Sequence, residues 1–375
     1  MDNLQFDLVR LIKTVFAPKP GERVGVFIDL QDPRALPAVD FAKDSKLGPQ
    51  RIAHEVFYQG LLKRKAELPF ASVEFFAYEP TGGSNLELPP TVVDLNGKTL
   101  QLEADVLRRL DIVFYLSTFS ATAPLTALAK RIGFRGATMH GCNETILRTG
   151  LAQDYNEVSR KAERFRQAVT RCDDVVLEFE TLGRKYRLTL ELGRQEAQKS
   201  HGLCRTPGEI ANLPAGEIYW VPTGAQGQFP MRFKEDGTLG LMEVSGRRIS
   251  QATLLRGDAT RVKAALALFE SDPATGELGE LGLGTQVLPF AGADIQDEKI
   301  LGTVHVATGR DDHLGGSSNL SRFKDKKHAT HEDILFAPLK TPEINVTGAW
   351  MHKDGKEVLL LKDYQPSEFV RQVAL

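Results

Sequence analysis

The sequence predicts an α/β domain with an open sheet over residues 1–172, followed by an α+β domain rich in antiparallel strands over residues 173–375. Two observations predict this fold class. In the first half, short apolar runs alternate with segments of helical spacing, as expected where strands and helices alternate along the chain. In the second half, short strands separated by turn residues dominate instead. We therefore expect the domain boundary near residue 172.

The elements of the first half follow in order from local composition. Val24–Asp29 is a short apolar run of the kind that is buried on both faces of a parallel sheet. Arg51–Lys65 has helical spacing, and Ser72–Tyr78 predicts the next strand. Asp111–Leu116 predicts a third strand, and a helix is expected over Pro124–Ile132, because proline suits a first helical turn.

The second half begins after a charged, amphipathic helix predicted over Asp154–Arg171. Val175–Glu180 and Tyr186–Leu192 flank a turn and carry alternating apolar residues, which predicts a β-hairpin. A further helix is expected over Arg261–Phe269. The polar segment 309–330 is a long loop, and loops above about 12–15 residues are usually functional or disordered. Whether it closes over a site as a lid is left open.

Composition excludes several classes of function. The 375 residues are 42% apolar and 26% charged, enough for two domains of about 100–200 residues each. Lys plus Arg number 47 and Asp plus Glu number 49, so no net field would attract nucleic acid or an anionic membrane. Cys142, Cys172 and Cys204 show no C-x-x-C spacing, which argues against a disulfide framework or a zinc ribbon. The start of the chain lacks a signal peptide, so we expect a cytoplasmic protein with a peptide or small-molecule substrate.

Motifs of several common enzyme classes are absent from the sequence. His54 and His331 each begin a zincin-like pattern, but Tyr58 and Leu335 stand where the second histidine is required. No dinucleotide-binding glycine motif, P-loop or nucleophile elbow occurs. These absences remove the strongest sequence arguments for dinucleotide, triphosphate or serine-hydrolase chemistry.

Four of the eight histidines fall between residues 305 and 331. His331 and Asp333 lie in the strand-like segment THEDILF, where residues i and i+2 project from the same face. An imidazole and a carboxylate therefore point into one site. His305 lies between Val304 and Val306, which we expect to face the core and leave His305 on the opposite side. Taken singly, the pair also suits a half-exposed strand, and His305 a structural histidine.

Two glutamates could join these residues. Glu217 follows a turn and enters a strand, whereas Glu280 is flanked by glycines in an otherwise apolar run. A carboxylate in such surroundings is costly to bury unless it is paired or bound to a metal. A solvated surface position is the alternative for both residues.

Two histidines and three carboxylates suit divalent ions such as Zn²⁺, Mn²⁺ or Co²⁺. Five ligands exceed what one tetrahedral zinc requires, so two metals that share a carboxylate would fit. Such a pair, about 3.5–4 Å apart, generates a hydroxide and polarises a carbonyl. The indicated reaction is hydrolysis of an amide or ester.

Four segments carry a family resemblance, namely Pro207–Glu217, Gly279–Gly284, Asp297–Gly309 and His331–Asp333. Their order resembles the thermophilic metallo-aminopeptidases, aminopeptidases T and S. The resemblance implies a homodimeric, metal-dependent aminopeptidase with an enclosed site, in which Glu280 or Glu217 moves the proton. The implied ligands of the two divalent ions, zinc, cobalt or manganese, are Glu217, Glu280, His305, His331 and Asp333.

One family feature is missing. These peptidases usually have a tyrosine shortly after the first metal-binding histidine, but this chain has GRDDH there, and Tyr364 is the only tyrosine from Trp220 to Gln365. His313 or Arg310 could only be suggested as a substitute for the phenol. The roles of these two residues and of Asp312 are left open.

A second family has a similar pattern. The ring-cleaving 2,5-dihydroxypyridine 5,6-dioxygenases look like the same fold and use an upstream histidine with an H-x-D pair on one iron(II) ion. His305, His331 and Asp333 would satisfy that arrangement equally. Retention of both Glu217 and Glu280 favours the two-metal hydrolase, which is the predicted function. A third alternative is a metal-free binding protein on an inactive enzyme scaffold.

Overall fold

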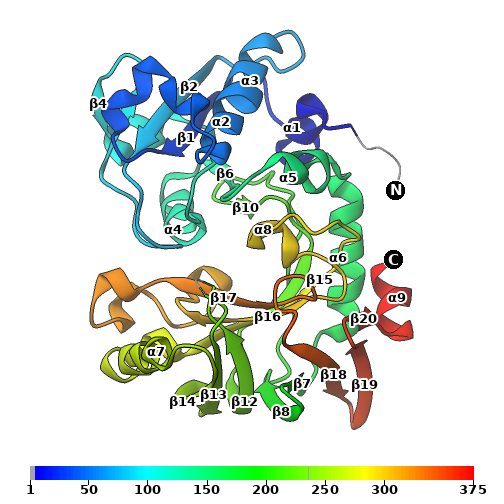
Figure 1. Ribbon diagram of the computed structural model, residues 1–375. Helices are drawn as coiled ribbons and strands as arrows, with labels where there is room; N and C mark the ends of the chain where they lie inside the picture. The colour runs from blue at the N-terminus through cyan, green and yellow to red at the C-terminus, as the bar shows by residue number, and fades with distance from the viewer. Residues whose placement is uncertain (1–4, 235) are drawn as a thin grey trace. The chain divides into compact units, whose positions relative to one another are not determined.

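The structure is a computed structural model that describes residues 5–234 and 236–375 (Figure 1). The chain divides into two compact units, of which unit 1 comprises Met1–Ser159 and His201–Ala215, and unit 2 comprises Arg160–Ser200 and Gly216–Leu375. The predicted fold class, an α/β domain followed by a strand-rich α+β domain, is confirmed. The domain boundary near residue 172 stays a prediction. The chain leaves unit 1 within a helix that precedes that boundary and returns to it for residues 201–215.

Unit 1 is built around sheet A. Its strands in spatial order are β10 (Ile210–Asn212), β6 (Arg135–Thr138), β5 (Ile112–Tyr115), β1 (Arg23–Asp29), β2 (Ser72–Tyr78), β3 (Thr91–Asp94) and β4 (Thr99–Gln101). The strands from β10 to β2 run parallel, and β3 and β4 add an antiparallel edge. Residues of β1 and β5 are buried almost throughout, which explains why these strands form continuous apolar runs in the sequence.

Helices accompany sheet A where apolar spacing predicts them. The helix predicted over Arg51–Lys65 corresponds to a continuous helical run from Gly48 to Lys63, which passes through a π-helical turn, η3. Helix α4 begins slightly before the predicted start and keeps Pro124 in its first turn. The helices of unit 1 are α1 (Leu8–Phe16), η1 (Pro33–Ala38), η2 (Asp40–Lys43), α2 (Gly48–Ile52), η3 (Ala53–Tyr58), α3 (Gln59–Lys63), η4 (Leu102–Val106), η5 (Leu107–Arg109), α4 (Thr122–Ile132), α5 (Glu144–Arg148) and η6 (Gly150–Ala152); α6 (Tyr155–Val169) ends in unit 2.

Unit 2 contains two antiparallel sheets. Sheet B has the order β14 (Arg248–Arg256), β13 (Leu239–Ser245), β12 (Gly224–Arg232), β8 (Arg184–Glu191), β7 (Asp174–Thr181), β18 (Asn345–Lys353), β19 (Lys356–Lys362) and β20 (Gln365–Pro366). Sheet C has the order β17 (His331–Phe336), β16 (Val304–Gly309), β15 (Leu278–Gly284), β11 (Glu217–Trp220) and β9 (Gln198–Ser200). Strands β7 and β8 form the predicted hairpin.

The helices of unit 2 are short apart from α6 and α7. They include α7 (Ala259–Ser271), η7 (Pro273–Gly276), α8 (Asp294–Asp297), η8 (Asp312–Leu314), η9 (Leu320–Arg322), η10 (Lys326–His328) and α9 (Glu368–Ala374). The long polar loop after residue 309 therefore contains short 3-10 turns. Among residues 5–234 and 236–375, no helix is both long and apolar enough to cross a membrane.

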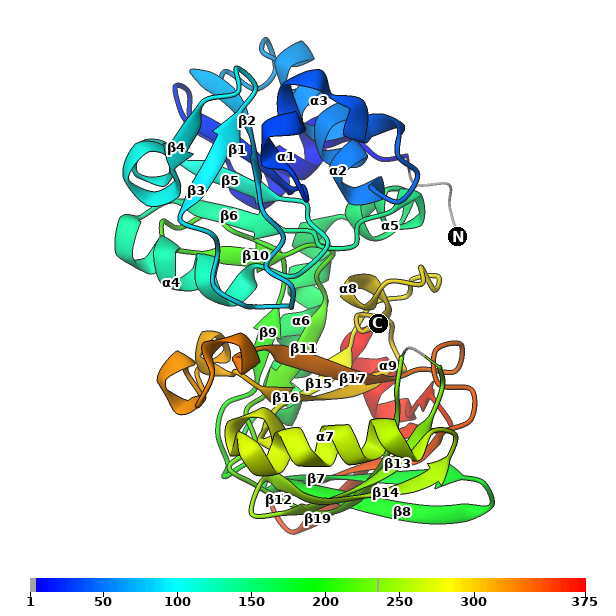
Figure 2. The same cartoon turned by 60° about the vertical axis from the view of Figure 1, so that its left-hand side comes forward.

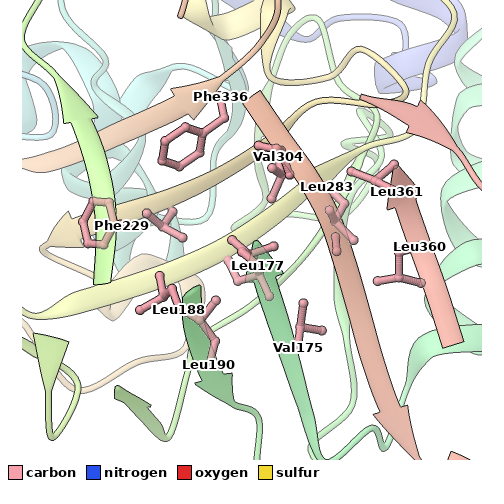
Figure 3. Close-up of a cluster of buried hydrophobic side chains, with 14 of the residues drawn as sticks. Val175, Leu177, Leu188, Leu190, Phe229, Leu283, Val304, Phe336, Leu360 and Leu361 are labelled. Carbon is pink, nitrogen blue, oxygen red and sulfur yellow. The ribbon is translucent and has the colours of Figure 1, made fainter. Parts of the chain in front are cut away.

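The core of unit 2 lies between sheets B and C (Figure 3). Val304 and Val306 of β16 and Ile334 and Phe336 of β17 belong to this core, together with side chains of β7, β8 and β12. Because successive strand residues point to opposite faces, the residues between them must face away from the core. One face of sheet C thus stabilises the unit, and the other face is available for a site.

A substitution in this core is expected to cost far more stability than one on the surface. Leu188 is fully buried on β8, whereas Leu339 is 71% exposed. We expect Leu188→Ala to lower the free energy of unfolding by about 2–5 kcal/mol, because it leaves a cavity between the sheets. Leu339→Ala should change it by no more than about 0.5 kcal/mol. Urea unfolding of both variants measures the difference, and equal costs would contradict this core assignment.

Candidate metal centre

Sheet C brings all five predicted ligands to its face opposite the core. Glu217 lies on β11, Glu280 on β15, His305 on β16, and His331 and Asp333 on β17. The register sets Glu280 opposite Ala307 and Ala307 opposite Asp333. The small side chain of Ala307 leaves room for the longer groups around it. The i, i+2 spacing expected for His331 and Asp333 is therefore realised on a strand.

The carboxylates and imidazoles approach one another closely. Glu280 lies between the two histidines, with Oε2 3.1 Å from His331 Nε2 and Oε1 3.5 Å from His305 Nε2. Asp333 Oδ1 is 3.2 Å from His331 Nε2, and Glu217 Oε2 is 3.7 Å from His305 Nε2. Ligand atoms of Glu217, Glu280 and His305 lie within 4.8 Å of one another, as do those of Glu280, His331 and Asp333. The cluster could hold a metal ion.

One hydrogen bond orients His331. Its Nδ1 lies 2.7 Å from the carbonyl oxygen of Arg310, and because a carbonyl only accepts, Nδ1 must carry the proton. Nε2 therefore faces the carboxylates of Glu280 and Asp333. A neutral imidazole would direct its Nε2 lone pair at two anions, so a proton or a metal ion is needed between them.

The carboxylates and imidazoles of the cluster shift one another's pKa values. Burial works to raise the pKa of Glu280, but hydrogen bonds with His305 and His331 outweigh burial and lower it to about 2. Burial works to lower the pKa of His305, yet Glu280 raises it to about 9. The pKa of His331 is also raised, because Asp333 and Glu280 outweigh burial. The carboxylates thus favour protonated imidazoles, and metal binding would have to release those protons.

Burial and unsatisfied atoms fit a bound cation. His305 is 1% exposed and Glu280 4%, whereas the Asp333 side chain is 27% exposed and marks the side open to solvent. Buried His305 Nδ1 and Glu217 Oε2 make no hydrogen bond within the described residues. Buried polar atoms normally have partners, so these atoms and the donor set are compatible with a metal ion.

Sequence reasoning missed Lys299 at this site. Its side chain is 1% exposed, and its Nζ donates a 2.5 Å hydrogen bond to Glu217 Oε1 and a second one to Glu298. Burial works to lower the pKa of Lys299, but Glu217 and Glu298 outweigh it and raise the pKa. Burial raises the pKa of Glu298 to about 7. Glu298 and Lys299 directly follow α8 and belong to the segment Asp297–Gly309 that carries the family resemblance, but their local composition is that of a solvated charged turn.

Sequence reasoning also missed Tyr219. This residue stands two positions after Glu217 on β11 and shares its face, so the i, i+2 rule used for His331 could have found it. Burial raises the pKa of the Tyr219 phenol, and the carboxylates of Glu280 and Glu217 raise it further. Its hydroxyl lies 3.4 Å from Gln198 Oε1. A protonated phenol therefore belongs to the cluster, although it comes from a different strand than expected.

The residues considered as substitutes for the missing tyrosine have other contacts. The ring of His313 meets that of His331 edge-on at 5.0 Å, and burial followed by the charge of His331 lowers the pKa of His313 to about 3. The guanidinium of Arg310 donates to Asp312 Oδ1 over 2.8 Å, while its carbonyl holds His331. These contacts place Arg310 and His313 around His331.

The imidazole of His305 rests over a glycine. A Cβ atom added at Gly282 would lie 2.1 Å from His305 Cε1, so Gly282→Ala must displace the ring. We expect the variant to stay folded and to lose about 10–100-fold in metal affinity, as when a supporting contact of a ligand is removed. Gly48→Ala is the control, since nothing lies within 4 Å of its added Cβ. Metal titration compares the two, and unchanged affinity in Gly282→Ala would exclude His305 as a ligand.

Comparison with known proteins finds a match in structure. No protein-family model and no curated relative matches the chain. A solved structure of a 2,5-dihydroxypyridine dioxygenase from Pseudomonas putida KT2440 aligns with a TM-score of 0.62. The chain shares the fold of this dioxygenase. The alignment covers 96% of this chain and 95% of the other at 12% sequence identity, a level at which likeness shows the fold alone.

The expectation of a metallo-aminopeptidase is wrong by this comparison. This dioxygenase, which aligns along almost the whole chain, is an oxidoreductase and not a peptide hydrolase. The structure also gives Glu217 a role that needs no second metal, because its carboxylate is bonded to the Lys299 ammonium. Retention of both glutamates therefore does not distinguish a two-metal hydrolase from a single-metal enzyme. A second divalent ion beside Glu217 would also be repelled by that ammonium.

Proposed function

We propose that this protein is a mononuclear iron(II) dioxygenase that opens the ring of a small dihydroxylated aromatic or nitrogen-heteroaromatic compound. The observation that carries the proposal is that His305, His331 and Asp333 share one face of two paired strands, where Asp333 belongs to one possible metal-binding group with His305 and Glu298 and to another with His331 and Glu280. The fold shared with a 2,5-dihydroxypyridine dioxygenase supports the same substrate class. An iron-dependent enzyme is favoured over a metal-free binding protein, because buried ligand atoms of the cluster have no hydrogen-bond partner among the described residues.

The proposed iron ligands are His305, His331 and Asp333. Two imidazoles and one carboxylate are the donor set of non-haem iron(II) oxygenases and leave positions open for dioxygen and substrate. Iron(II), when bound, supplies the electron transfer with dioxygen that ring cleavage requires. The carbonyl of Arg310 keeps His331 Nε2 directed at the site, since it holds the proton of that ring on Nδ1.

The remaining polar residues of the cluster are assigned to the substrate. Glu280 lies between the two histidines, where its carboxylate oxygens can accept a hydrogen bond from a ring hydroxyl. The Tyr219 phenol keeps its proton, because burial and the neighbouring carboxylates raise its pKa, and it can donate to the charge that develops on the ring. Lys299 offsets part of the negative charge that Glu217 and Glu298 would otherwise add beside the substrate.

Anaerobic reconstitution tests the proposal. Metal-free protein is loaded with iron(II), the metal content is measured by mass spectrometry, and oxygen uptake is followed with 2,5-dihydroxypyridine, catechol and hydroquinone. We expect one iron per chain and one O₂ consumed per ring opened, with both atoms of ¹⁸O₂ in the product. Folded protein that binds no iron would support the metal-free alternative. One bound iron with no oxygen uptake on any of these rings would contradict this substrate class.

The other expectations from the sequence stay predictions. They are the homodimer, the absence of nucleic-acid and membrane partners, and the cytoplasmic location. Sedimentation of the iron-loaded protein would test the homodimer directly. The metal-binding groups of sheet C lie within unit 2, so a monomer would not by itself contradict the proposed iron site.

A further inference from the structure

Gln198 connects two parts of the site that come from different elements of unit 2. It lies on β9, the edge strand of sheet C, and its backbone pairs with that of Tyr219 on β11. Its side-chain Nε2 donates a 2.7 Å hydrogen bond to the carbonyl oxygen of Leu314. Its Oε1 lies 3.4 Å from the hydroxyl of Tyr219. One half-buried amide therefore contacts both the phenol of the site and the loop that follows β16.

The contact with Leu314 fixes the orientation of this amide. A carbonyl oxygen only accepts a hydrogen bond, so the amide nitrogen of Gln198 must face Leu314 and the amide oxygen must face Tyr219. Because an amide oxygen carries no proton, the Tyr219 hydroxyl donates to it. At 3.4 Å this hydrogen bond is long and therefore weak. The phenol is held in place, yet its O–H can rotate toward a substrate oxygen that gains negative charge.

The turn that accepts from Gln198 is itself held to the rest of unit 2. The N–H of Leu314 donates to the carbonyl of Asp311, which closes the short helix η8. The Asp311 side chain is fully buried and accepts from the backbone of Ser318 and from the guanidinium of Arg247. Figure 2 shows this loop in orange, at the side of unit 2 where β9 is labelled. The carbonyl of Leu314 therefore has a defined position relative to sheet C.

The first part of the same loop also contacts the proposed iron ligand His331. The carbonyl of Arg310 accepts from its Nδ1, and the ring of His313 meets its ring edge-on. The loop thus contacts a proposed metal ligand directly and the phenol of Tyr219 through Gln198. It therefore sets the position of the phenol relative to the metal centre.

We propose that Gln198 is a positioning residue, which holds the Tyr219 phenol where it meets an oxygen of the substrate ring. The inference rests on the proposed dioxygenase function. Before the ring binds, the phenol donates its hydrogen bond to the amide of Gln198. During the reaction the same O–H turns to the ring oxygen that becomes negative, and a donor that is already in place stabilises that charge. Gln198 acts through Tyr219 and not on the ring itself.

A double-substitution cycle tests whether Gln198 acts through Tyr219. In the iron-loaded full chain with 2,5-dihydroxypyridine, Tyr219→Phe should lower kcat by about 100-fold, as when one charge-stabilising donor is lost. Gln198→Met should lower kcat by about three- to tenfold and leave KM unchanged, because the hydrogen bond acts on the transition state. In the Tyr219→Phe background the same substitution should have no further effect. Effects that multiply, or an unchanged kcat in Gln198→Met, would overturn the proposal.

Gln195→Met is the matched control. Gln195 is also half-buried, and its amide donates to the carbonyls of Leu192 and Val221 instead of to a loop of the site. We expect its kcat and KM to equal those of the unmodified chain. A loss of kcat as large as that in Gln198→Met would mean that general loosening of this segment explains both results, and the assignment of Gln198 would be overturned.

A measurement without turnover separates this inference from the proposed function. The full chain is labelled with 3-fluorotyrosine before iron is loaded, and the ¹⁹F resonance of Tyr219 is assigned by its absence in Tyr219→Phe. We expect Gln198→Met to shift this resonance and Gln195→Met to leave it unchanged. An unshifted resonance in Gln198→Met overturns the hold on the phenol. If the shift is present but the unmodified chain takes up no oxygen, the dioxygenase function fails while the contact between Gln198 and Tyr219 is confirmed.

Discussion

Replacing His331 with alanine is expected to lower the affinity for iron(II) by more than about a hundredfold, since loss of an outer-shell partner alone costs about 10–100-fold. Oxygen uptake with dihydroxylated rings should fall to background in the same variant. The physical reason is the position of His331 Nε2, which faces Glu280 and Asp333 at 3.1 and 3.2 Å. Anaerobic titration with limiting iron(II), followed by oxygen electrode measurements, gives both values.

His352 offers a matched control for that variant. It lies on β18 of the same unit and pairs with Asp174 Oδ1 at 2.6 Å, far in sequence from the proposed ligands. We expect His352→Ala to keep its iron and its activity. If His331→Ala folds and retains full iron content, His331 is not a ligand. If His352→Ala loses iron to the same extent, loss of fold and not loss of a ligand explains both results.

Replacing Lys299 with methionine is expected to cost about 3–5 kcal/mol of stability, because two buried carboxylates lose their only shared cation in the described structure. The iron-loaded variant should regain stability when millimolar Mn²⁺ is added, since Glu217 and Glu298 would then face a vacancy suited to a divalent ion. The unmodified protein should not respond, because the ammonium already occupies that position. Thermal unfolding with and without Mn²⁺ measures both effects.

Two further variants control this result. Lys199 forms a partly exposed pair with Glu163 at 2.9 Å, so Lys199→Met should cost at most about 1 kcal/mol and show no response to Mn²⁺. Lys299→Met combined with Glu217→Gln should be more stable than Lys299→Met alone, because one uncompensated carboxylate has been removed. A Lys299→Met protein as stable as the unmodified chain would contradict the role assigned to the buried ammonium.

The strands that carry the site were predictable because their signals are local. Val304 and Val306 flank His305, so strand periodicity alone assigns the imidazole to the face away from the core. The same period places His331 and Asp333 together. The structure has all three side chains in the same cluster on sheet C. The fold class was predictable for a similar reason, since buried parallel strands and half-buried antiparallel strands differ in composition over a few residues.

The function was predicted less well because it depended on which cation neutralises Glu217. A glutamate that binds a second metal and a glutamate that pairs with a lysine have the same appearance in a sequence. The partner of Glu217 lies 82 residues further along the chain, and only the fold brings the two together. The sequence does not associate Tyr219 with the histidines, because the expected phenol follows His305 along the chain whereas Tyr219 lies on a different strand, β11.

Sequence periodicity was sufficient to specify the fold class and the strands of sheet C. It also specified the side of each strand on which a histidine or carboxylate lies. These features depend only on residues close together in the sequence. The tertiary structure decided which charges meet. It set Lys299 between Glu217 and Glu298, oriented His331 through the carbonyl of Arg310, and joined Gln198 to Tyr219 and Leu314. The reason is that pairing between distant charges and hydrogen bonding between distant strands and loops depend on long-range packing, which no local pattern records.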